Sequence, residues 1–155
     1  MIDLHLHSSA SDGKDSPAEL IARASARKLT LVALTDHDTL GGVPEFLAAA
    51  AEAGIHAVKG IEISAAFYES ELHLLGYGVD VENQALLELL ESIRKRRRAR
   101  NRQIFTLMKN LGLPADYDRW QAMLTTPSPG RPHIADYLIV LQKHSLAGCA
   151  CAEKV

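Results

Sequence analysis

The chain has 155 residues, of which 47% are hydrophobic and 23% are charged, and these proportions favour a folded domain over a disordered segment. The formal net charge is 17 minus 19, or −2, but seven basic residues lie between Arg94 and Arg102, which leaves 10 minus 19, or −9, elsewhere. No apolar run approaches the ~18 residues of a membrane span and no signal peptide is recognisable, so we expect a cytoplasmic protein without membrane partners. Cys149 and Cys151 are expected to be free thiols.

The first eighty residues alternate between strand and helix patterns. A period of two marks the first strand, and Ser16-Pro17-Ala18-Glu19 has the residues of a helix N-cap, a proline at the first position and a capping box. The expected strands are 2–6, 30–34 and 56–64, the expected helices are 17–27 and 43 to about 54, and 67–79 is another extended stretch or a hairpin. This order is typical of parallel α/β units.

The second half of the chain has a helical pattern. We expect a long helix from about Asn83 to Leu111, followed by shorter helices at 116–124 and 132–143. The apolar stripe of the long helix is interrupted at Arg97, Arg100 and Asn101, so that stretch does not face an apolar core. We therefore divide the chain into an α/β part at 1–82 and a helical segment with a terminal tail at 83–155.

Histidines and carboxylates follow the successive strands. His5 and His7 are two residues apart at the end of the first strand, so both imidazoles face the same side. The carboxyl ends of parallel strands gather at one rim, where such folds bind ligands. The other polar residues placed at this rim are Asp12, Asp36, His37, Asp38, Glu62 and His73. Histidine mixed with carboxylates favours Mn, Zn or Fe(II), often as a multinuclear site.

Two of these carboxylates are expected to position a metal ligand and not to bind the metal themselves. Asp36 and Asp38 are candidates to orient His37, and Asp36 is the candidate catalytic residue of this kind, whereas Glu62 is suited to bridge two cations. Asp38 has an equally weighted alternative as a helix cap.

The motifs, taken in order, resemble those of the PHP (polymerase and histidinol phosphatase) family. A further segment, Gly130-Arg-Pro-His133, resembles the small PHP phosphoesterases that act on nucleoside 3′,5′-bisphosphates and on the 5′ ends of short RNAs. The resemblance covers about residues 1–137 and rests on Asp3-Leu-His-Leu-His7-Ser, Ser11-Asp12-Gly13, Thr35-Asp36-His37-Asp38-Thr39, Gly60-Ile-Glu62-Ile-Ser64 and His73-Leu-Leu-Gly-Tyr-Gly78.

The resemblance implies a distorted (β/α)7 barrel with a trinuclear centre, usually of manganese or zinc, that hydrolyses phosphoesters through a metal-activated water. It implies that Arg131 and His133 hold the substrate phosphate, and that the metal ligands are His5, His7, Asp12, His37, Glu62 and His73. The substrate would be a phosphorylated nucleotide or a short RNA.

The chain also departs from the family pattern. The I-A-H-P and D-x-H motifs of the family are absent, so we expect a partial barrel with fewer metal ligands and weak activity. We also expect self-association through the exposed edges of the sheet. Residues 139–155 are interpreted as a non-family tail that results from truncation or a frameshift. The basic run Arg94–Arg102 is interpreted as a solvated helix face, or alternatively as a guide for a polyanionic substrate. The alternative function is a non-catalytic metal-binding remnant, or an interaction module that uses this helix.

Overall fold

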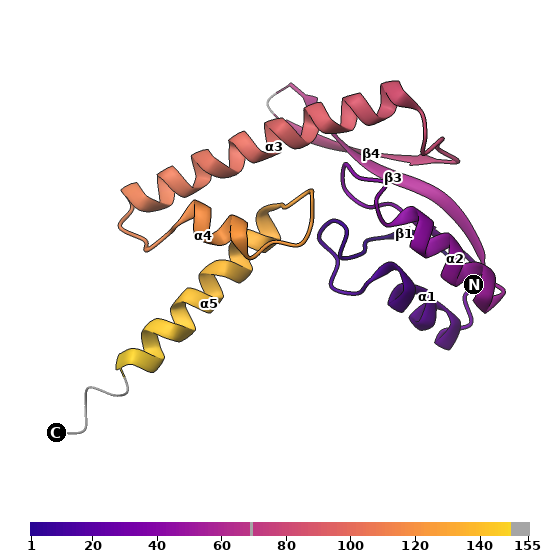
Figure 1. The fold of residues 1–155 in the computed structure, drawn as a ribbon, viewed down its shortest axis with the longest axis horizontal. Helices are drawn as coiled ribbons and strands as arrows, with labels where there is room; N and C mark the ends of the chain where they lie inside the picture. The colour runs from indigo at the N-terminus through magenta and orange to yellow at the C-terminus, as the bar shows by residue number, and fades with distance from the viewer. Residues whose placement is uncertain (69, 150–155) are drawn as a thin grey trace.

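A computed structural model describes residues 1–68 and 70–149 of the chain (Figure 1). The elements follow the order expected from the sequence through the first eighty residues, and a predominantly helical part comes after them. They are β1 (Ile2–Leu6), α1 (Pro17–Ala26), β2 (Leu31–Leu34), α2 (Val43–Ala53), β3 (His56–Phe67), β4 (Ser70–Tyr77), α3 (Gln84–Asn110), α4 (Tyr117–Ala122) and α5 (Arg131–Cys149).

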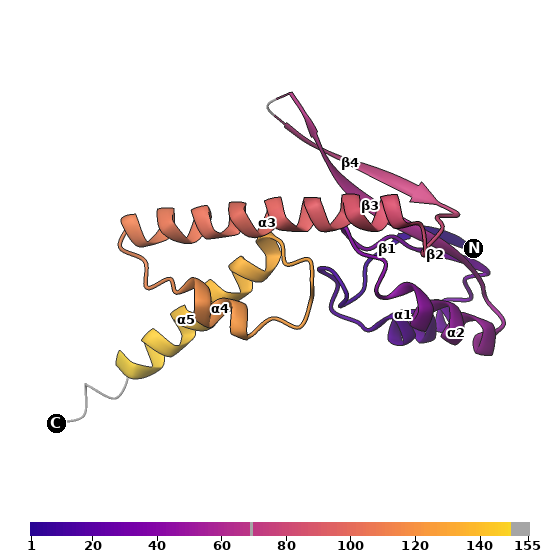
Figure 2. The same ribbon diagram turned by 45° about the horizontal axis from the view of Figure 1, so that its top comes forward.

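The four strands form one sheet in the order β1-β2-β3-β4. β1 pairs with β2, and β2 with β3, in parallel, whereas β3 and β4 form an antiparallel hairpin. The expected parallel units are confirmed, and of the two alternatives for 67–79 the hairpin is correct, with Ser70–Tyr77 as its second strand. β3 continues to Phe67, beyond the expected end at Ser64, because β4 pairs with it residue by residue as far as Ser70. This hairpin projects from the rest of the molecule (Figure 2).

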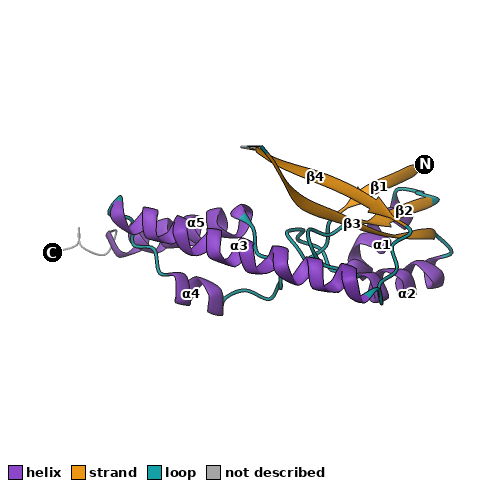
Figure 3. Ribbon diagram, turned by 90° about the horizontal axis from the view of Figure 1, so that it is seen from above, coloured by secondary structure: helices purple, strands orange, loops and turns teal. Residues whose placement is uncertain are grey.

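The sheet is curled, so that its two outer strands approach each other. The Tyr77 hydroxyl on β4 donates a hydrogen bond of 2.9 Å to the Leu4 carbonyl on β1. The helices α1 and α2 lie to one side of the strands (Figure 3). The predicted α/β fold class with a partial barrel therefore holds.

Local signals fix the ends of the first two helices. Ser16 and Glu19 form the predicted capping box at the start of α1, and Gly54 ends α2 with a φ of 68°. Both helices bury one face against the sheet. The resulting core contains Ile21, Ala24, Val32, Leu34, Leu40, Val43, Phe46, Ala50, Ile55, Ile61 and Leu90.

A second apolar cluster lies in the helical part of the chain. It is built around Phe105 and Trp120, which are 1% and 2% exposed. The first half of α3 packs on the sheet core through Leu90, and its second half supplies Phe105 to the second cluster. Because α3 contributes to both clusters, the division at residue 82 stays a prediction (Figure 2).

Two expectations about the chain as a whole meet the structure only in part. Among the residues that the structure describes, none of the helices combines the length and apolar character needed to traverse a bilayer. Cys151 lies outside the described residues, and Cys149 is described only as the last residue of α5, so the predicted free thiols stay a prediction.

Candidate metal centre

The strand ends bring six predicted ligands to one rim of the sheet. His5 and His7 come from the end of β1 and the loop after it, and His37 follows β2. A parallel bridge pairs His37 with Glu62 of β3, and the Glu62 amide donates to the Asp36 carbonyl at 3.1 Å. His73 reaches the same point from β4 because the hairpin pairs its backbone with Ser64, two residues beyond Glu62.

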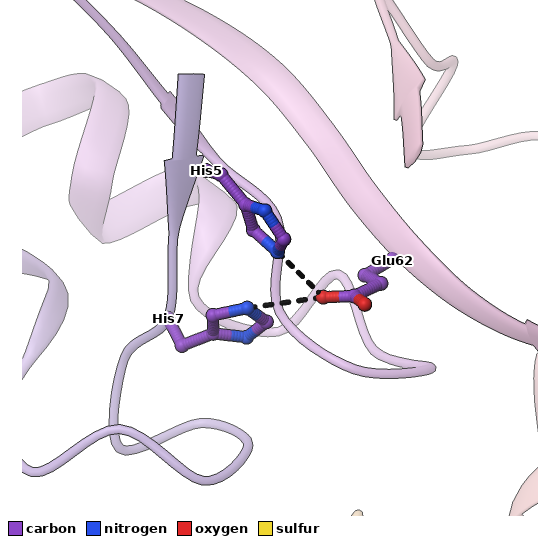
Figure 4. Close-up of side chains that lie close together, drawn as sticks. All are labelled: His5, His7 and Glu62. Carbon is purple, nitrogen blue, oxygen red and sulfur yellow. Dashed lines mark hydrogen bonds and ion pairs between the residues drawn. The ribbon is translucent and has the colours of Figure 1, made fainter. Parts of the chain in front are cut away.

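Glu62 is the centre of this cluster. Its side chain is 5% exposed, and Figure 4 shows the rings of His5 and His7 directed at one carboxylate oxygen. The Nε2 atoms of His5 and His7 lie 2.8 Å and 3.0 Å from Oε2, and Nδ1 of His73 lies 2.8 Å from Oε1. Nδ1 of His37 is 3.8 Å from Oε2. Four imidazoles therefore surround one carboxylate.

Asp12 extends the cluster on the side of the loop that follows β1. Its Oδ1 lies 3.5 Å from Nδ1 of His7, and its Oδ2 lies 3.6 Å from Nε2 of His37. Three overlapping sets of side chains each offer ligand atoms within 4.8 Å of one another, namely His5, His7 and Glu62, then His7, Asp12 and His37, then His37, Glu62 and His73.

The donor set fits divalent transition metals. Nδ1 of His7 and Nδ1 of His37 are buried and have no hydrogen-bond partner among residues 1–68 and 70–149, which is costly for polar atoms unless a bound ligand contacts them. Imidazole nitrogens combined with carboxylate oxygens are typical ligands of Zn, Mn and Fe(II). The six residues therefore offer donor atoms of the kinds that these metals bind, and their role as ligands stays a prediction.

The electrostatics of the cluster favour the ligand forms of these groups. Burial lowers the pKa of His37 and outweighs the carboxylates of Asp12 and Glu62, so the ring is neutral at neutral pH and one of its two nitrogens has a lone pair available. Burial on its own would raise the pKa of Glu62, but the hydrogen bond from His5 and the nearby imidazoles lower it on balance. Glu62 is therefore an anion at neutral pH.

Asp36 holds the loop that carries His7 and Asp12. Its carboxylate accepts hydrogen bonds from the Ser8 amide at 2.7 Å, the Ser8 hydroxyl at 2.6 Å and the Ser11 hydroxyl at 2.6 Å. Burial raises the pKa of Asp36, and these three donors oppose that rise. The sequence predicted that Asp36 orients His37, whereas its oxygens in the structure contact the loop. The serines were not predicted, although both lie in the motifs around His7 and Asp12.

Asp38 connects the rim that carries the histidine cluster to the basic helix α3. It has a φ of 54° and is fully buried, and its carboxylate accepts from the Ser64 amide at 2.8 Å and pairs with Arg97. The helix-cap alternative is wrong, because the N-cap of α2 is Gly42 and lacks a side-chain bond. Asp38 therefore acts as an anchor for α3.

The basic run is not a uniformly solvated face. The Arg97 side chain is 9% exposed, and Arg94 donates to the Asp38 carbonyl at 2.9 Å. The expected solvated face is wrong for these two arginines, because the carboxylate and carbonyl of Asp38 replace water around their guanidinium groups. On the same helix, Asn101 is fully buried and donates to the Pro129 carbonyl at 2.9 Å.

The two predicted phosphate ligands flank the cluster on different sides. His133 lies in the first turn of α5, where Nδ1 accepts from the Gly130 amide at 3.1 Å, and it lines a hollow together with Asp12. The Arg131 side chain is 68% exposed and lies 3.4 Å from Glu71, whose other oxygen is 3.9 Å from His73. His133 thus lies on the Asp12 side and Arg131 on the His73 side.

The chain matches the PHP domain over residues 3–128, which include all six residues of the cluster. It belongs to the PHP domain family. This PHP chain is 40% identical over 139 residues to a 3′,5′-nucleoside bisphosphate phosphatase of Chromobacterium violaceum, covering 89% of the chain and 49% of that protein. It is 38% identical over 148 residues to a 5′-3′ exoribonuclease of Haemophilus influenzae, covering 96% of the chain and 54% of that protein.

Solved structures agree with the family assignment. An amidohydrolase from Chromobacterium violaceum with bound sulfate and no metal superposes with a TM-score of 0.82 at 40% identity, over 89% of this chain and 49% of that one. A Bifidobacterium adolescentis protein proposed to be a metal-dependent phosphoesterase gives 0.83 at 29% identity, over 98% and 54%. The PHP chain therefore spans about half the length of the relatives it matches.

Proposed function

We propose that this PHP chain belongs to a metal-dependent phosphoesterase that hydrolyses phosphomonoesters of nucleotides, such as 3′,5′-bisphosphates, or acts at the 5′ ends of short RNAs. The observation that carries the proposal is the buried Glu62 carboxylate with four imidazoles within 3.8 Å of its oxygens. The named activities of the Chromobacterium violaceum and Haemophilus influenzae relatives support this substrate class.

The proposed metal ligands are the six predicted ones, His5, His7, Asp12, His37, Glu62 and His73. We propose manganese or zinc, with iron as a further candidate, and two or three ions per site in the complete family fold. Three sets of donor atoms support this number, and the Glu62 carboxylate, which belongs to two of them, is able to bridge two cations. When bound, such cations supply an acidified water and neutralise phosphate oxygens.

The chain's own residues then have distinct tasks. His37 serves as a neutral ligand because of its lowered pKa, and Asp36 positions the loop that presents His7 and Asp12. Arg131 approaches the phosphate from the His73 side and offers the fork of N–H donors that suits phosphate oxygens. His133 approaches from the Asp12 side. The phosphate would thereby lie between the histidine cluster and the first turn of α5, which carries Arg131 and His133.

The test compares the wild-type chain with the His5→Ala and Glu62→Ala variants. We expect the wild type to bind Mn²⁺ or Zn²⁺ and to release phosphate from adenosine 3′,5′-bisphosphate, and both variants to lose bound metal and at least ~100-fold of the rate. The His56→Ala variant is the matched control, because His56 is exposed at the opposite end of β3. Retention of metal by the wild type without phosphate release under any divalent cation would instead favour a non-catalytic metal-binding module.

Self-association is a second part of the proposal. β1 and β4 are the outer strands of the sheet and carry exposed apolar side chains, including Ile2 at 60% and Leu74 at 49%. Exposed strand edges with apolar side chains favour pairing with another chain. We propose that a second copy covers this surface. Sedimentation analysis of the wild type should show a dimer, and the Leu74→Lys variant should dissociate more readily. A wild type that stays monomeric at high concentration would contradict the proposed self-association.

A further inference from the structure

The helical part of the chain contacts the loop that carries Asp12. The Thr126 hydroxyl donates a hydrogen bond of 2.7 Å to the Ala10 carbonyl, across 116 residues of sequence. Figures 1 and 2 both show the segment between α4 and α5 beside the loop that follows β1. Ala10 lies two residues before Asp12, and Thr126 and Asp12 line the same hollow between the two segments. Neither the metal ligands nor the phosphate contacts proposed above include this hydroxyl.

The Thr126 hydroxyl is held in the orientation that this contact needs. Its oxygen accepts a hydrogen bond of 3.1 Å from the Ser128 amide, and its single proton is directed at Ala10. The segment itself is tied to α3, because the fully buried Asn101 donates to the Pro129 carbonyl at 2.9 Å. Thr126 is 9% exposed. It is therefore a fixed support and not a freely rotating surface side chain.

The loop after β1 is held by two separate elements. Asp36, which follows β2, accepts hydrogen bonds from Ser8 and Ser11. Thr126 holds the carbonyl of Ala10, which lies between these two serines. Loss of the Thr126 hydroxyl leaves the Ala10 carbonyl without this donor, while the bonds of the serines to Asp36 remain. Thr126 thus fixes a part of the loop that the contacts of Asp36 do not include.

The position of the Asp12 carboxylate depends on the backbone of this loop. The carboxylate accepts a hydrogen bond of 3.5 Å from the Ser11 hydroxyl, whereas bonds between oxygens are normally about 2.5–3.0 Å long. Such a long bond holds the side chain weakly. The two carboxylate oxygens lie 3.5 Å from His7 and 3.6 Å from His37. A small shift of the loop therefore changes the distances from Asp12 to both imidazoles.

We propose that Thr126 is a positioning residue of the metal site, and that it acts on metal binding through Asp12. The inference rests on the proposed metal site and assigns the segment before α5 a task in it. Groups that orient metal ligands without touching the metal change metal affinity about 10- to 100-fold. Thr126 acts one step further away, through a backbone carbonyl. We therefore expect loss of its hydroxyl to weaken the binding of Mn²⁺ or Zn²⁺ about 5- to 10-fold, the range of one hydrogen bond.

The first test measures the affinity for Mn²⁺ and Zn²⁺ by competition titration, which does not depend on turnover. Thr126→Val keeps the shape of the side chain, removes the hydroxyl and should show the 5- to 10-fold loss. Thr126→Ser keeps the hydroxyl and should bind metal as the wild type does. The matched control is Thr125→Val, the same substitution at the exposed neighbouring residue. Unchanged affinity in Thr126→Val, or an equal loss in Thr126→Ser, would overturn the inference.

Two double variants separate positioning of Asp12 from a general loss of structure. In the Asp12→Asn background, Thr126→Val should cause little further loss of metal affinity, because the ligand through which it acts is already altered. In the His73→Ala background the loss should persist, since His73 contacts the other oxygen of Glu62 from β4. A loss of the same size in both backgrounds, or in neither, would contradict the role of Asp12 in the inference.

The last test uses the metal-free chain. The amides of Ser9, Ser11 and Gly13 form hydrogen bonds of 2.8–3.0 Å within the segment from Ser8 to Asp15. Thr126→Val should raise the hydrogen-exchange rates of these amides several-fold, whereas Thr125→Val should not. Unchanged exchange in Thr126→Val would overturn the inference. A wild-type chain that binds no divalent cation would contradict the proposed function, whereas the exchange rates would still decide whether Thr126 holds the loop.

Discussion

Arg97 and Asp38 form an ion pair between two segments that are 59 residues apart in the sequence. Arg97 lies in the middle of α3, and Asp38 follows the end of β2, beside the predicted metal ligand His37. Asp38 is fully buried, and its carboxylate also accepts hydrogen bonds from Ser64. The pair therefore fixes the basic helix against the rim that carries the histidine cluster.

Removing one member of this pair should destabilise the protein strongly. In the Asp38→Asn variant, Arg97 stays buried without its counter-charge, and we expect a loss of about 3–5 kcal/mol in the free energy of unfolding, measured by urea denaturation. The Arg97→Met/Asp38→Asn double variant should recover part of that loss, because neither charge is then left alone. If the double variant instead loses as much stability as the Asp38→Asn and Arg97→Met single variants together, the two side chains are not coupled.

The Asp36→Asn variant tests whether Asp36 positions the loop of the metal site. Asparagine has only one acceptor oxygen for the three donors of Ser8 and Ser11, so we expect a loss of at least about 2 kcal/mol in stability. The affinity for Mn²⁺ or Zn²⁺ should fall about 10- to 100-fold, although Asp36 is not a ligand. The exposed Asp118 supplies the control, since Asp118→Asn should change neither quantity. Unchanged metal affinity in Asp36→Asn would contradict this role.

Gly13 is required by a close backbone approach in the same loop. A Cβ atom at this position would lie 2.1 Å from the His7 carbonyl oxygen and 2.9 Å from the Ser8 carbonyl carbon, so the backbone must move. The Gly13→Ala variant should therefore displace His7 and weaken metal binding at least ~10-fold, as measured by a competition titration. In contrast, Gly41→Ala should be neutral, because the nearest atom to its Cβ is the Thr39 hydroxyl at 3.4 Å.

The capping box of α1 predicts a pH dependence that is independent of the metal site. The hydrogen bond from the Ser16 backbone lowers the pKa of Glu19 below its usual 4.5 in the folded state. The stabilisation by the carboxylate is therefore present above about pH 4.5, and it is lost as the pH falls through the folded-state pKa. Urea midpoints of the wild type and Glu19→Gln should differ at pH 7, and the difference should shrink as the pH falls below about 4.5. A constant difference would contradict the assignment. The exposed Glu52→Gln is the control.

Local patterns sufficed to predict the order of the strands and helices and the convergence of the candidate ligands. The capping residues Ser16 and Glu19, the Gly54 that ends α2 and the alternation in β1 act within a few residues, and the structure has each where the pattern indicated. The histidines and carboxylates at successive strand ends meet because parallel strands end at one rim. The sequence could therefore predict that His5, His7, Glu62 and His73 converge.

Long-range pairings decided what the sequence left open. The solvated basic face expected from the sequence is wrong at Arg94 and Arg97, because both contact Asp38, which precedes them by 56 and 59 residues. The role of Asp36 depended on the serines of a loop 25 and 28 residues earlier.

The sequence by itself determined the strand and helix pattern and the residues at the strand ends, because these follow from side-chain periodicity and short-range hydrogen bonds. Only the tertiary structure decided that α3 turns Arg97 inward, that Tyr77 links the outer strands, and that Thr126 contacts the loop after β1. Such contacts form between segments that are far apart in the sequence, and a local residue pattern does not predict which distant segments will pack together.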